Sequence, residues 1–337
     1  SSGVKTHRDH FVVGFTKEEI VQRLGVITGD LPDDLVKEGL KLRDTGTWQL
    51  KEARRKVKEE LKEKNPKDNI YSYAYRPFDN RCVYYSDLLI DRPRREIMQH
   101  LALENLALVT TRQLANLPFA HCFPIRNIGD ICLISLSTKE SAYFFPLYLY
   151  LFPSKEDLSK DTTESKSRQT NFKPEFISAI QNTYGKEPSP EQIFYYIYGI
   201  LYSNIYRKKY EEFLQIDFPR IPFTSDSQLL QKIGELGKQL VELHLLKSPL
   251  LSQPEGKYPV IGTDSVEKWA YEEKTGRVFI NPQQYFEGIP KDIWEYRVGN
   301  YQVLDKWLKY HKGRSLSPDD VEHYLKVIAA IKHTITL

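Results

Sequence analysis

Residues 70–101, "IYSYAYRPFDNRCVYYSDLLIDRPRREIMQHL", decide the fold class that this sequence predicts. Two short runs of tyrosine, valine and other strand-forming residues stand on either side of "RPFDN", whose proline, aspartate and asparagine are typical of a turn. The run "RPRREIMQHL" that follows has the pattern of a helix. The stretch therefore predicts strands with a helix beside them.

Similar short runs continue toward the C-terminus. The runs "LALVTT", "AHCFPI" and "DICLISLS" are rich in β-branched and aromatic residues and are separated by Pro, Asn, Asp and Gly. We therefore expect a sheet-rich core over about residues 70–152. The next section, residues 153–173, is polar and poor in apolar side chains, so it predicts a mobile surface loop.

Helical patterns dominate residues 174–247. Ser189 and the proline after it predict a helix start, and the apolar residues on all sides of that helix predict burial. The run "DFPRIPF" predicts an extended strand edge, after which Ser225 or Asp226 caps a further helix. Apolar residues at helical spacing on this further helix predict packing against a partner helix: Leu229, Ile233, Leu236, Leu240 and Leu243.

The two ends of the chain complete an α+β fold class. Thr16 caps one charged helix and another stops at Pro66, so residues 1–65 predict a solvated helical connector and residues 66–337 the main domain. Residues 255–285 predict strands that join the 70–152 core, with "EKTGRVFIN" as a hairpin, and Ser317 starts the closing helix. The expected fold is a mixed β-sheet core with flanking helices and helical N- and C-terminal segments.

Composition excludes several classes of protein. The chain has 337 residues, of which 40% are hydrophobic, so it can bury a large core. The net charge of +3 is too small to indicate a nucleic-acid binder by itself. Three cysteines without paired short spacings predict buried thiols in a reducing cytoplasm rather than disulfides or a zinc site. No apolar run is long enough to span a bilayer, so we expect no membrane association.

The sequence contains no motif of a known catalytic site. It lacks the phosphate-binding loop, the Gly-x-Gly-x-x-Gly fingerprint, the Asn/Asp-Pro-Pro-aromatic motif of amino-methyltransferases and the Gly-x-Ser-x-Gly turn. Eight scattered histidines form no His-Glu-x-x-His arrangement, so each is interpreted as structural. We therefore predict no catalytic or metal-ligating residue and no cofactor in this chain. A metal-dependent nuclease built from scattered acidic residues is an alternative hypothesis.

Arginine is the only strongly basic residue type in the section that predicts the sheet. No lysine occurs from Asn69 to Thr138, although both flanking sections are rich in lysine. Arginine offers a planar fork of donors that can bind a phosphate or a guanine edge in two places. The alternative is that these arginines form ordinary salt bridges with nearby acids: Asp79, Asp87, Asp91, Glu96 and Asp130.

Polar residues at the ends of predicted strands favour the DNA-binding hypothesis. The runs "VTTRQ" and "FPIRN" place on loops the residue types that contact base edges. Arg92, Arg94 and Arg95, at a predicted helix start, are interpreted as phosphate contacts. The complete predicted set of DNA-binding residues is Arg76, Arg81, Arg92, Arg94, Arg95, Thr111, Arg112, Gln113, Arg126 and Asn127.

Several longer runs resemble a known family. "YRPFDNRCVYYS", "ALVTTRQ", "IFYYIYGILYSNIYRKKYEEFLQIDFPRIPF", "LGKQLVELHLL" and "YQVLDKWLKYHKGRSLSPDDVEHY" together look like the C-terminal specificity region of type ISP and related single-chain restriction-modification enzymes. The resemblance runs from about residue 70 to the end, and its order and spacing make it specific. The opening "SSGVKTHRDHFVVGF" resembles the segment that follows the adenine methyltransferase domain of such enzymes, so we expect the chain to be a C-terminal piece of a longer protein.

This resemblance implies a function that no motif in the chain states. It implies a target-recognition-domain-like module that binds double-stranded DNA and positions an upstream adenine methyltransferase, which uses S-adenosylmethionine, and in many relatives a nuclease. Individual base-contacting residues do not follow from it, because recognition loops differ with the target. The alternatives are the self-sufficient nuclease and a helical protein-interaction module, in which residues 191–214 would be an exposed partner groove rather than core.

Overall fold

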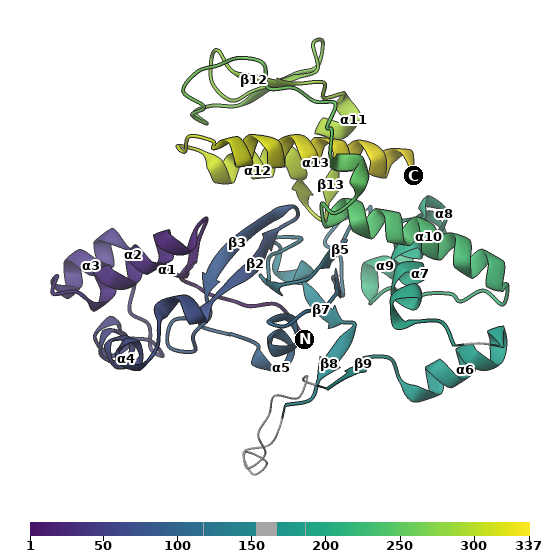
Figure 1. Cartoon of the computed structure of the whole chain (residues 1–337), viewed down its shortest axis with the longest axis horizontal. Coiled ribbons are helices and arrows are strands. Elements are labelled where there is room, and N and C mark those ends of the chain that lie inside the picture. The colour runs from purple at the N-terminus through teal and green to yellow at the C-terminus, as the bar shows by residue number, and fades with distance from the viewer. Residues whose placement is uncertain (117, 153–166, 186) are drawn as a thin grey trace.

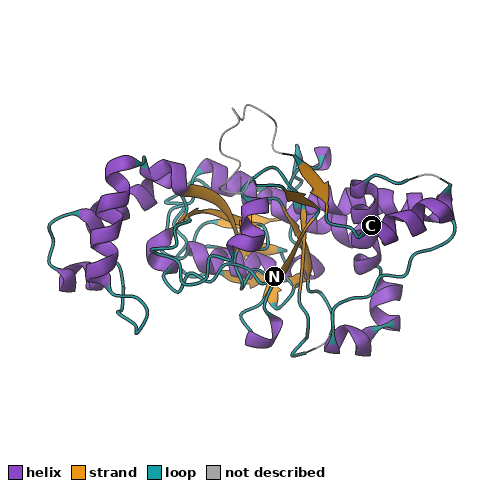
Figure 2. Ribbon diagram, turned by 90° about the horizontal axis from the view of Figure 1, so that it is seen from below, coloured by secondary structure: helices purple, strands orange, loops and turns teal. Residues whose placement is uncertain are grey.

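The computed structural model describes residues 1–116, 118–152, 167–185 and 187–337. Three lobes surround a central group of sheets (Figure 1), and the view from below shows the strands between two groups of helices (Figure 2). The α+β prediction is confirmed. The N-terminal lobe consists of α1 (Asp9–Val12), α2 (Lys17–Thr28), α3 (Asp33–Gly39) and α4 (Leu50–Glu63), followed by a 3-10 turn at Pro66–Asn69.

The predicted strands form two central sheets. The first has the order β1-β3-β2-β6, with β2 antiparallel to β3 and parallel to β6. The second has the order β5-β4-β7, antiparallel throughout. The strands are β1 (Val13–Gly14), β2 (Ile70–Arg76), β3 (Asp79–Tyr84), β4 (Ala107–Thr110), β5 (Cys122–Ile125), β6 (Ile128–Gly129) and β7 (Tyr143–Pro146), and α5 (Arg95–Leu101) lies beside them.

One expectation for this region was wrong, and another lies mostly outside the described residues. The run "DICLISLS" forms no strand, because the chain turns at Asp130, whose Oδ1 accepts a hydrogen bond from Cys132 N at 2.6 Å. A short 3-10 turn, Thr138–Glu140, follows it. Of the predicted loop at 153–173, residues 153–166 lie outside the described residues. Within the rest, β9 (Arg168–Thr170) pairs with β8 (Tyr148–Tyr150).

In the helical lobe, α7 and α10 begin at predicted capping residues. It contains α6 (Pro174–Tyr184), α7 (Pro190–Tyr202), α8 (Asn204–Lys209), α9 (Glu211–Ile216) and α10 (Ser227–His244). Ser189 forms a capping box on α7, and Asp226, rather than Ser225, caps α10. The run "DFPRIPF" connects α9 to α10 without joining a sheet, since its two prolines remove backbone donors.

The apolar and aromatic residues of the run 193–214 are partly buried in the core and partly exposed at the surface. In α7, Ile193 and Tyr198 are fully buried, as predicted. In α8 and α9, by contrast, Ile205 is 80% exposed and Phe213 is 66% exposed. This half is amphipathic, since Tyr206 and Leu214 on the same two helices are buried in a hydrophobic cluster. The partner of α10 is α7, but the predicted stripe is only partly right, because Leu229 and Leu236 face solvent.

The C-terminal lobe is a layer of helices between two groups of strands (Figure 1). It contains a 3-10 turn (Pro249–Leu251), α11 (Lys291–Trp294), α12 (Val303–His311) and α13 (Pro318–Thr336). Its strands are β10 (Ala270–Glu272), β11 (Arg277–Phe279), β12 (Tyr285–Glu287), β13 (Arg297–Val298) and β14 (Tyr301–Gln302). Ser317 caps α13 and the predicted hairpin forms between β10 and β11.

These C-terminal strands do not join the central sheets. The sheet β10-β11-β12 is separate, and it shares the main hydrophobic core through side chains of the helices between. The Phe286 ring packs against Tyr324 of α13 at 4.4 Å, and Tyr324 packs against Trp307 of α12 at 4.9 Å. The 255–285 strands therefore join the 70–152 core, as predicted, but by side-chain packing rather than by strand pairing.

Candidate nucleic-acid interface

Arg76, the last residue of β2, lies inside the protein. Its side chain is 6% exposed, and its Nη1 lies 3.0 Å from Asp130 Oδ1. The guanidinium stacks over the Tyr75 ring at 3.9 Å, and its Nε donates to Tyr310 Oη of α12 at 3.1 Å. Burial, the largest single influence, lowers the pKa of Arg76, but Asp130 and the neighbouring tyrosines together raise that pKa above its ordinary value.

Arg81 on β3 is enclosed in the same way. Its Nε and Nη2 lie 3.1 and 2.8 Å from the two oxygens of Asp79. The Phe15 ring and the Tyr75 ring cover the guanidinium, each at 4.2 Å. The salt-bridge alternative therefore describes Arg76 and Arg81, whose donors point into the molecule, and we leave both out of the interface proposed below.

Of the three arginines around the start of α5, Arg92 and Arg95 lie at the surface. Arg94 is half-buried, and its Nε is enclosed without a hydrogen-bond partner among the described residues. The helix begins at Arg95, as predicted, and Arg94 occupies the cap with a φ of 56°. Arg95 is 52% exposed and pairs with Asp87 at 2.8 Å, and Arg92 is 57% exposed and lies 3.5 Å from Asp91. Such exposed pairs contribute little to stability and exchange partners readily, so these arginines remain available to phosphates.

The loop after β4 places two of its predicted residues in solvent and one inside. Thr111 is 2% exposed, and its hydroxyl donates to Gln113 O at 3.0 Å, so it shapes the loop. Arg112 and Gln113 are exposed. Arg112 Nε lies 3.2 Å from Asp217 Oδ1, and Gln113 Nε2 lies 3.5 Å from Ile216 O, so both side chains extend toward the end of α9.

Arg126 and Asn127 lie at the other end of the same sheet. The antiparallel register pairs Thr110 with Cys122 at one end of β4 and Ala107 with Ile125 at the other, so residues 111–113 and 126–127 leave opposite ends. Arg126 and Asn127 line a pocket of about 370 Å³ together with Lys247. The structure therefore separates these two predicted base-reading pairs.

Strand β7 brings the α5 arginines and the 111–113 loop to one region. Phe218, which follows Asp217, packs against Tyr143 of β7 at 5.1 Å. On the other side, Ser1 O accepts from Phe144 N of β7 at 2.9 Å, and Ser1 Oγ donates to Glu96 in the first turn of α5 at 2.9 Å. We call the side chains that flank this strand the β7 surface: the exposed Arg92, Arg95, Arg112 and Gln113 and the half-buried Arg94.

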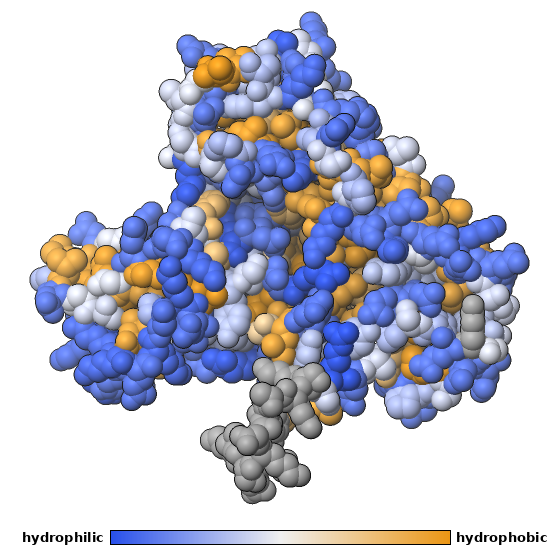
Figure 3. Space-filling model, viewed as in Figure 1, coloured by the Kyte–Doolittle hydropathy of each residue, from blue (hydrophilic) through white to orange (hydrophobic). Residues whose placement is uncertain are grey.

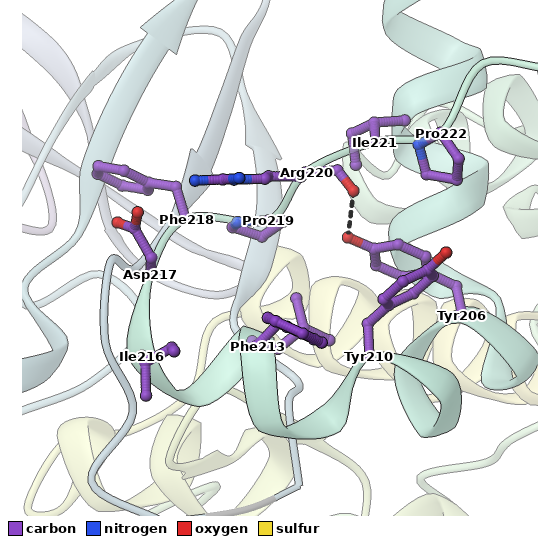
Figure 4. A pocket seen from close by; sticks show the side chains of 11 residues that line it. Tyr206, Tyr210, Phe213, Ile216, Asp217, Phe218, Pro219, Arg220, Ile221 and Pro222 are labelled. Carbon is purple, nitrogen blue, oxygen red and sulfur yellow. Dashed lines mark hydrogen bonds between the residues drawn. The ribbon is translucent and has the colours of Figure 1, made fainter.

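The segment between α9 and α10 adds an arginine that sequence reasoning missed. Residues 217–222 form one wall of an open pocket of about 570 Å³ (Figure 4). Tyr206 Oη donates to Arg220 O at 2.9 Å, which fixes the backbone, and the exposed Arg220 side chain extends toward Phe218. No carboxylate lies within 4 Å of Arg220 among the residues that the structure describes. The only sequence signal was the extended "FPRIPF" run.

The space-filling view shows a hollow in the surface. On the face shown in Figure 3 this hollow lies between the three lobes and is bordered by both hydrophilic and hydrophobic residues. Within the described ranges, no group of three or more His, Cys, Asp or Glu side chains could hold a metal ion. A search of the described helices for membrane-spanning length and apolar content finds none that qualifies.

Comparisons with known proteins place the chain in a family. The family model described as the type ISP C-terminal specificity domain matches residues 1–337. A search of curated proteins gave no match. Solved structures do match, among them the ATP-dependent type ISP restriction-modification enzyme LlaBIII bound to DNA, with 20% identity and a TM-score of 0.72 over 99% of this chain and 22% of that one.

Two further solved structures have the same fold. One is a nuclease-deletion mutant of the type ISP enzyme LlaGI in complex with a DNA substrate mimic, with 20% identity, a TM-score of 0.68 and coverage of 99% of this chain and 27% of that one. The other is a DrdV–DNA complex, with 21% identity, a TM-score of 0.71 and coverage of 100% and 35%. This chain thus spans roughly a fifth to a third of those proteins. On the match of the family model over its whole length, the chain belongs to the type ISP C-terminal specificity domains.

Proposed function

We propose that this chain is the module that recognises a specific duplex DNA sequence within a restriction-modification enzyme. The observation that carries the proposal is the specificity-domain model matching residues 1–337. The solved proteins of the same fold are described as bound to DNA or to a DNA substrate mimic, which supports a DNA partner here. The β7 surface supplies residue types suited to that partner, since arginine and glutamine form paired hydrogen bonds with base edges.

The same proposal assigns chemistry to other parts of the polypeptide. An adjoining adenine methyltransferase domain would use S-adenosylmethionine, and this chain would hold the duplex in register for it without a cofactor of its own. Type ISP relatives in the comparison are described as restriction-modification enzymes, and the chain spans only part of their length. We place the activity in the cytoplasm, where such an enzyme meets DNA.

Two variants of the full-length polypeptide should distinguish contacts to base edges from contacts to phosphates. Changing Arg112 to Ala should weaken binding to the selected target duplex by about 1–3 kcal/mol and relax its preference at one position, because a paired contact to a base edge is lost. Changing Arg95 to Ala should weaken binding to target and scrambled duplexes alike, because phosphates carry no sequence information. Selection from a randomised duplex pool followed by competition binding measures both.

A matched control uses Arg55 on the outer helix α4. Arg55 is 55% exposed and pairs with Glu52 and Glu59, so it resembles Arg95 in exposure but lies on another lobe. Changing Arg55 to Ala should leave both affinities unchanged. Equal, undiminished binding of the Arg112 and Arg95 variants to every duplex would contradict the assignment of the β7 surface.

Salt should weaken the binding strongly. The β7 surface offers few cations, and non-specific affinity for DNA arises chiefly from counterion release by such contacts. We expect affinity for a scrambled duplex to fall by roughly tenfold or more between low and physiological salt. Fluorescence anisotropy across a salt series gives the slope, and an affinity that does not change with salt would rule out this electrostatic mode.

A further inference from the structure

Glu140 lies among polar groups from four separate segments inside the protein. Its side chain is fully buried at the end of the Thr138–Glu140 turn. Oε1 accepts from Ala115 N at 2.7 Å, and Oε2 accepts from Ser135 Oγ at 2.6 Å and from Asn300 Nδ2 in the β13–β14 turn. The Nε2 atom of His121, which is also buried, lies 3.6 Å from Oε2.

The histidine lies beside this carboxylate without hydrogen-bonding to it, since His121 Nε2 has no hydrogen-bond partner among the described residues. Burial lowers the pKa of His121, although Glu140 acts in the opposite direction. Nδ1 of the ring accepts a weak hydrogen bond from Ala120 N at 3.4 Å, so the proton of the neutral ring belongs on Nε2. The three groups that hydrogen-bond to the Glu140 carboxylate, Ala115 N, Ser135 Oγ and Asn300 Nδ2, all donate to it, so a group that only accepts hydrogen bonds is required there.

The Ala115 contact fixes the loop that carries Arg112 and Gln113. Within this loop, Leu114 N donates to Gln215 O at 3.0 Å and the next residue donates to Glu140. Two consecutive backbone N–H groups are thus anchored, one to α9 and one to the buried carboxylate. The exposed side chains of residues 112 and 113 lie directly before these anchors, so their direction depends on both.

We propose that Glu140 is a positioning residue for sequence recognition: it holds the 111–116 loop so that Arg112 and Gln113 meet base edges in a fixed direction. The proposal rests on the function proposed above. Base-edge hydrogen bonds need placement within a few tenths of an ångström, and residues that hold the contacting group supply that precision. Through Asn300, the same carboxylate also ties the loop to the C-terminal lobe.

Glutamine at this position tests the requirement for an acceptor-only group. It has nearly the same shape as glutamate, but one of its two terminal atoms donates instead of accepting. With the amide nitrogen at the Oε1 position, Ala115 N loses its acceptor; at the Oε2 position, the nitrogen meets the Asn300 amide and the Ser135 hydroxyl. Either orientation breaks part of the clamp while the packing volume is kept.

The experiment compares Glu140→Gln with wild type in the full-length polypeptide. We expect hydrogen exchange of the Ala115 amide and its neighbours to accelerate at least tenfold. The preference for target over scrambled duplex should fall about tenfold, with affinity for the scrambled duplex unchanged. Ser141→Ala, next to the site but outside it, is the matched control, and Val278→Ala in the C-terminal sheet controls for a general loss of stability; neither should alter the preference.

The outcomes separate this proposal from the one on which it rests. If wild type itself shows no preference among duplexes, the proposed function fails and the exchange measurement alone decides whether Glu140 orders the loop. If wild type discriminates and Glu140→Gln discriminates equally well, the positioning role is overturned. It is also overturned if Val278→Ala reduces the preference as much as Glu140→Gln, since the effect would then reflect stability alone.

Discussion

Replacing Arg76 by Ala is expected to lower the free energy of unfolding by about 3–5 kcal/mol, because it strands a buried carboxylate. Asp130 is 4% exposed and lies 3.0 Å from the Arg76 guanidinium. Tyr73 Oη and Cys132 N also donate to it, at 2.7 and 2.6 Å, and these bonds do not supply a positive charge. Without the Arg76 cation, the Asp130 carboxylate is buried without a charge partner, which destabilises the folded state.

Chemical denaturation of the chain measures this effect, and Arg95→Ala is the matched control. The pair formed by Arg95 and Asp87 is 52% and 58% exposed, so its loss should change stability by no more than about 0.5 kcal/mol. The double variant Arg76→Met with Asp130→Asn should recover most of the loss, since it removes both charges and keeps an acceptor for Tyr73. A loss below about 1 kcal/mol in the single variant would show that the pair is not the stabilising element described here.

The predicted helix starts were confirmed where the signal is local. Thr16, Ser189 and Ser317 each accept a hydrogen bond from the backbone N–H three residues later, and Asp226 accepts from the second and third. Residue type and the next few positions determine such a cap, so the sequence alone reveals it. The prediction of a strand at "DICLISLS" was wrong, because it rested on the apolar pattern alone. That pattern does not show the turn in which Asp130 accepts a hydrogen bond from the backbone of Cys132.

Contacts between distant segments of the chain determine whether each arginine is buried or exposed. Arg76 and Asp130 are 54 residues apart, and the parallel pairing of β2 with β6 brings them together, Ala74 lying opposite Gly129. Nothing in the local pattern distinguishes Arg76 from Arg112, which the structure places in solvent. The salt-bridge hypothesis describes the buried Arg76 and Arg81, and DNA binding by the exposed arginines stays a prediction. Only the fold could distinguish the two groups.

Glu140 was missed for a related reason. Its neighbours in sequence, Thr138 and Lys139, are exposed, so the run "STKES" has the composition of a surface loop. Only the folded chain brings residues 115, 121 and 300 together around the Glu140 carboxylate. Buried polar centres of this kind are assembled by tertiary structure, and no spacing rule in one sequence identifies them.

A single methyl group on α10 is expected to have opposite effects three residues apart. At Gly237 an added Cβ would lie 1.8 Å from Tyr195 O and 2.9 Å from Gly199 N of α7, distances at which the two helix backbones must move apart. Gly237→Ala should therefore cost about 3 kcal/mol, near the upper end for overpacking, because backbone atoms cannot rotate away as side chains do. The two helix backbones therefore approach closely where Gly237 faces Gly199.

At Gly234 the same substitution meets open space. The nearest atom to an added Cβ is Gln192 O at 3.7 Å, an ordinary contact, so the gain in helix propensity should stabilise the chain by about 1 kcal/mol. The two variants are identical in chemistry and helix context, and denaturation midpoints measured side by side isolate the packing. If Gly237→Ala were as stable as Gly234→Ala, α7 and α10 would not approach as closely as this structure has them.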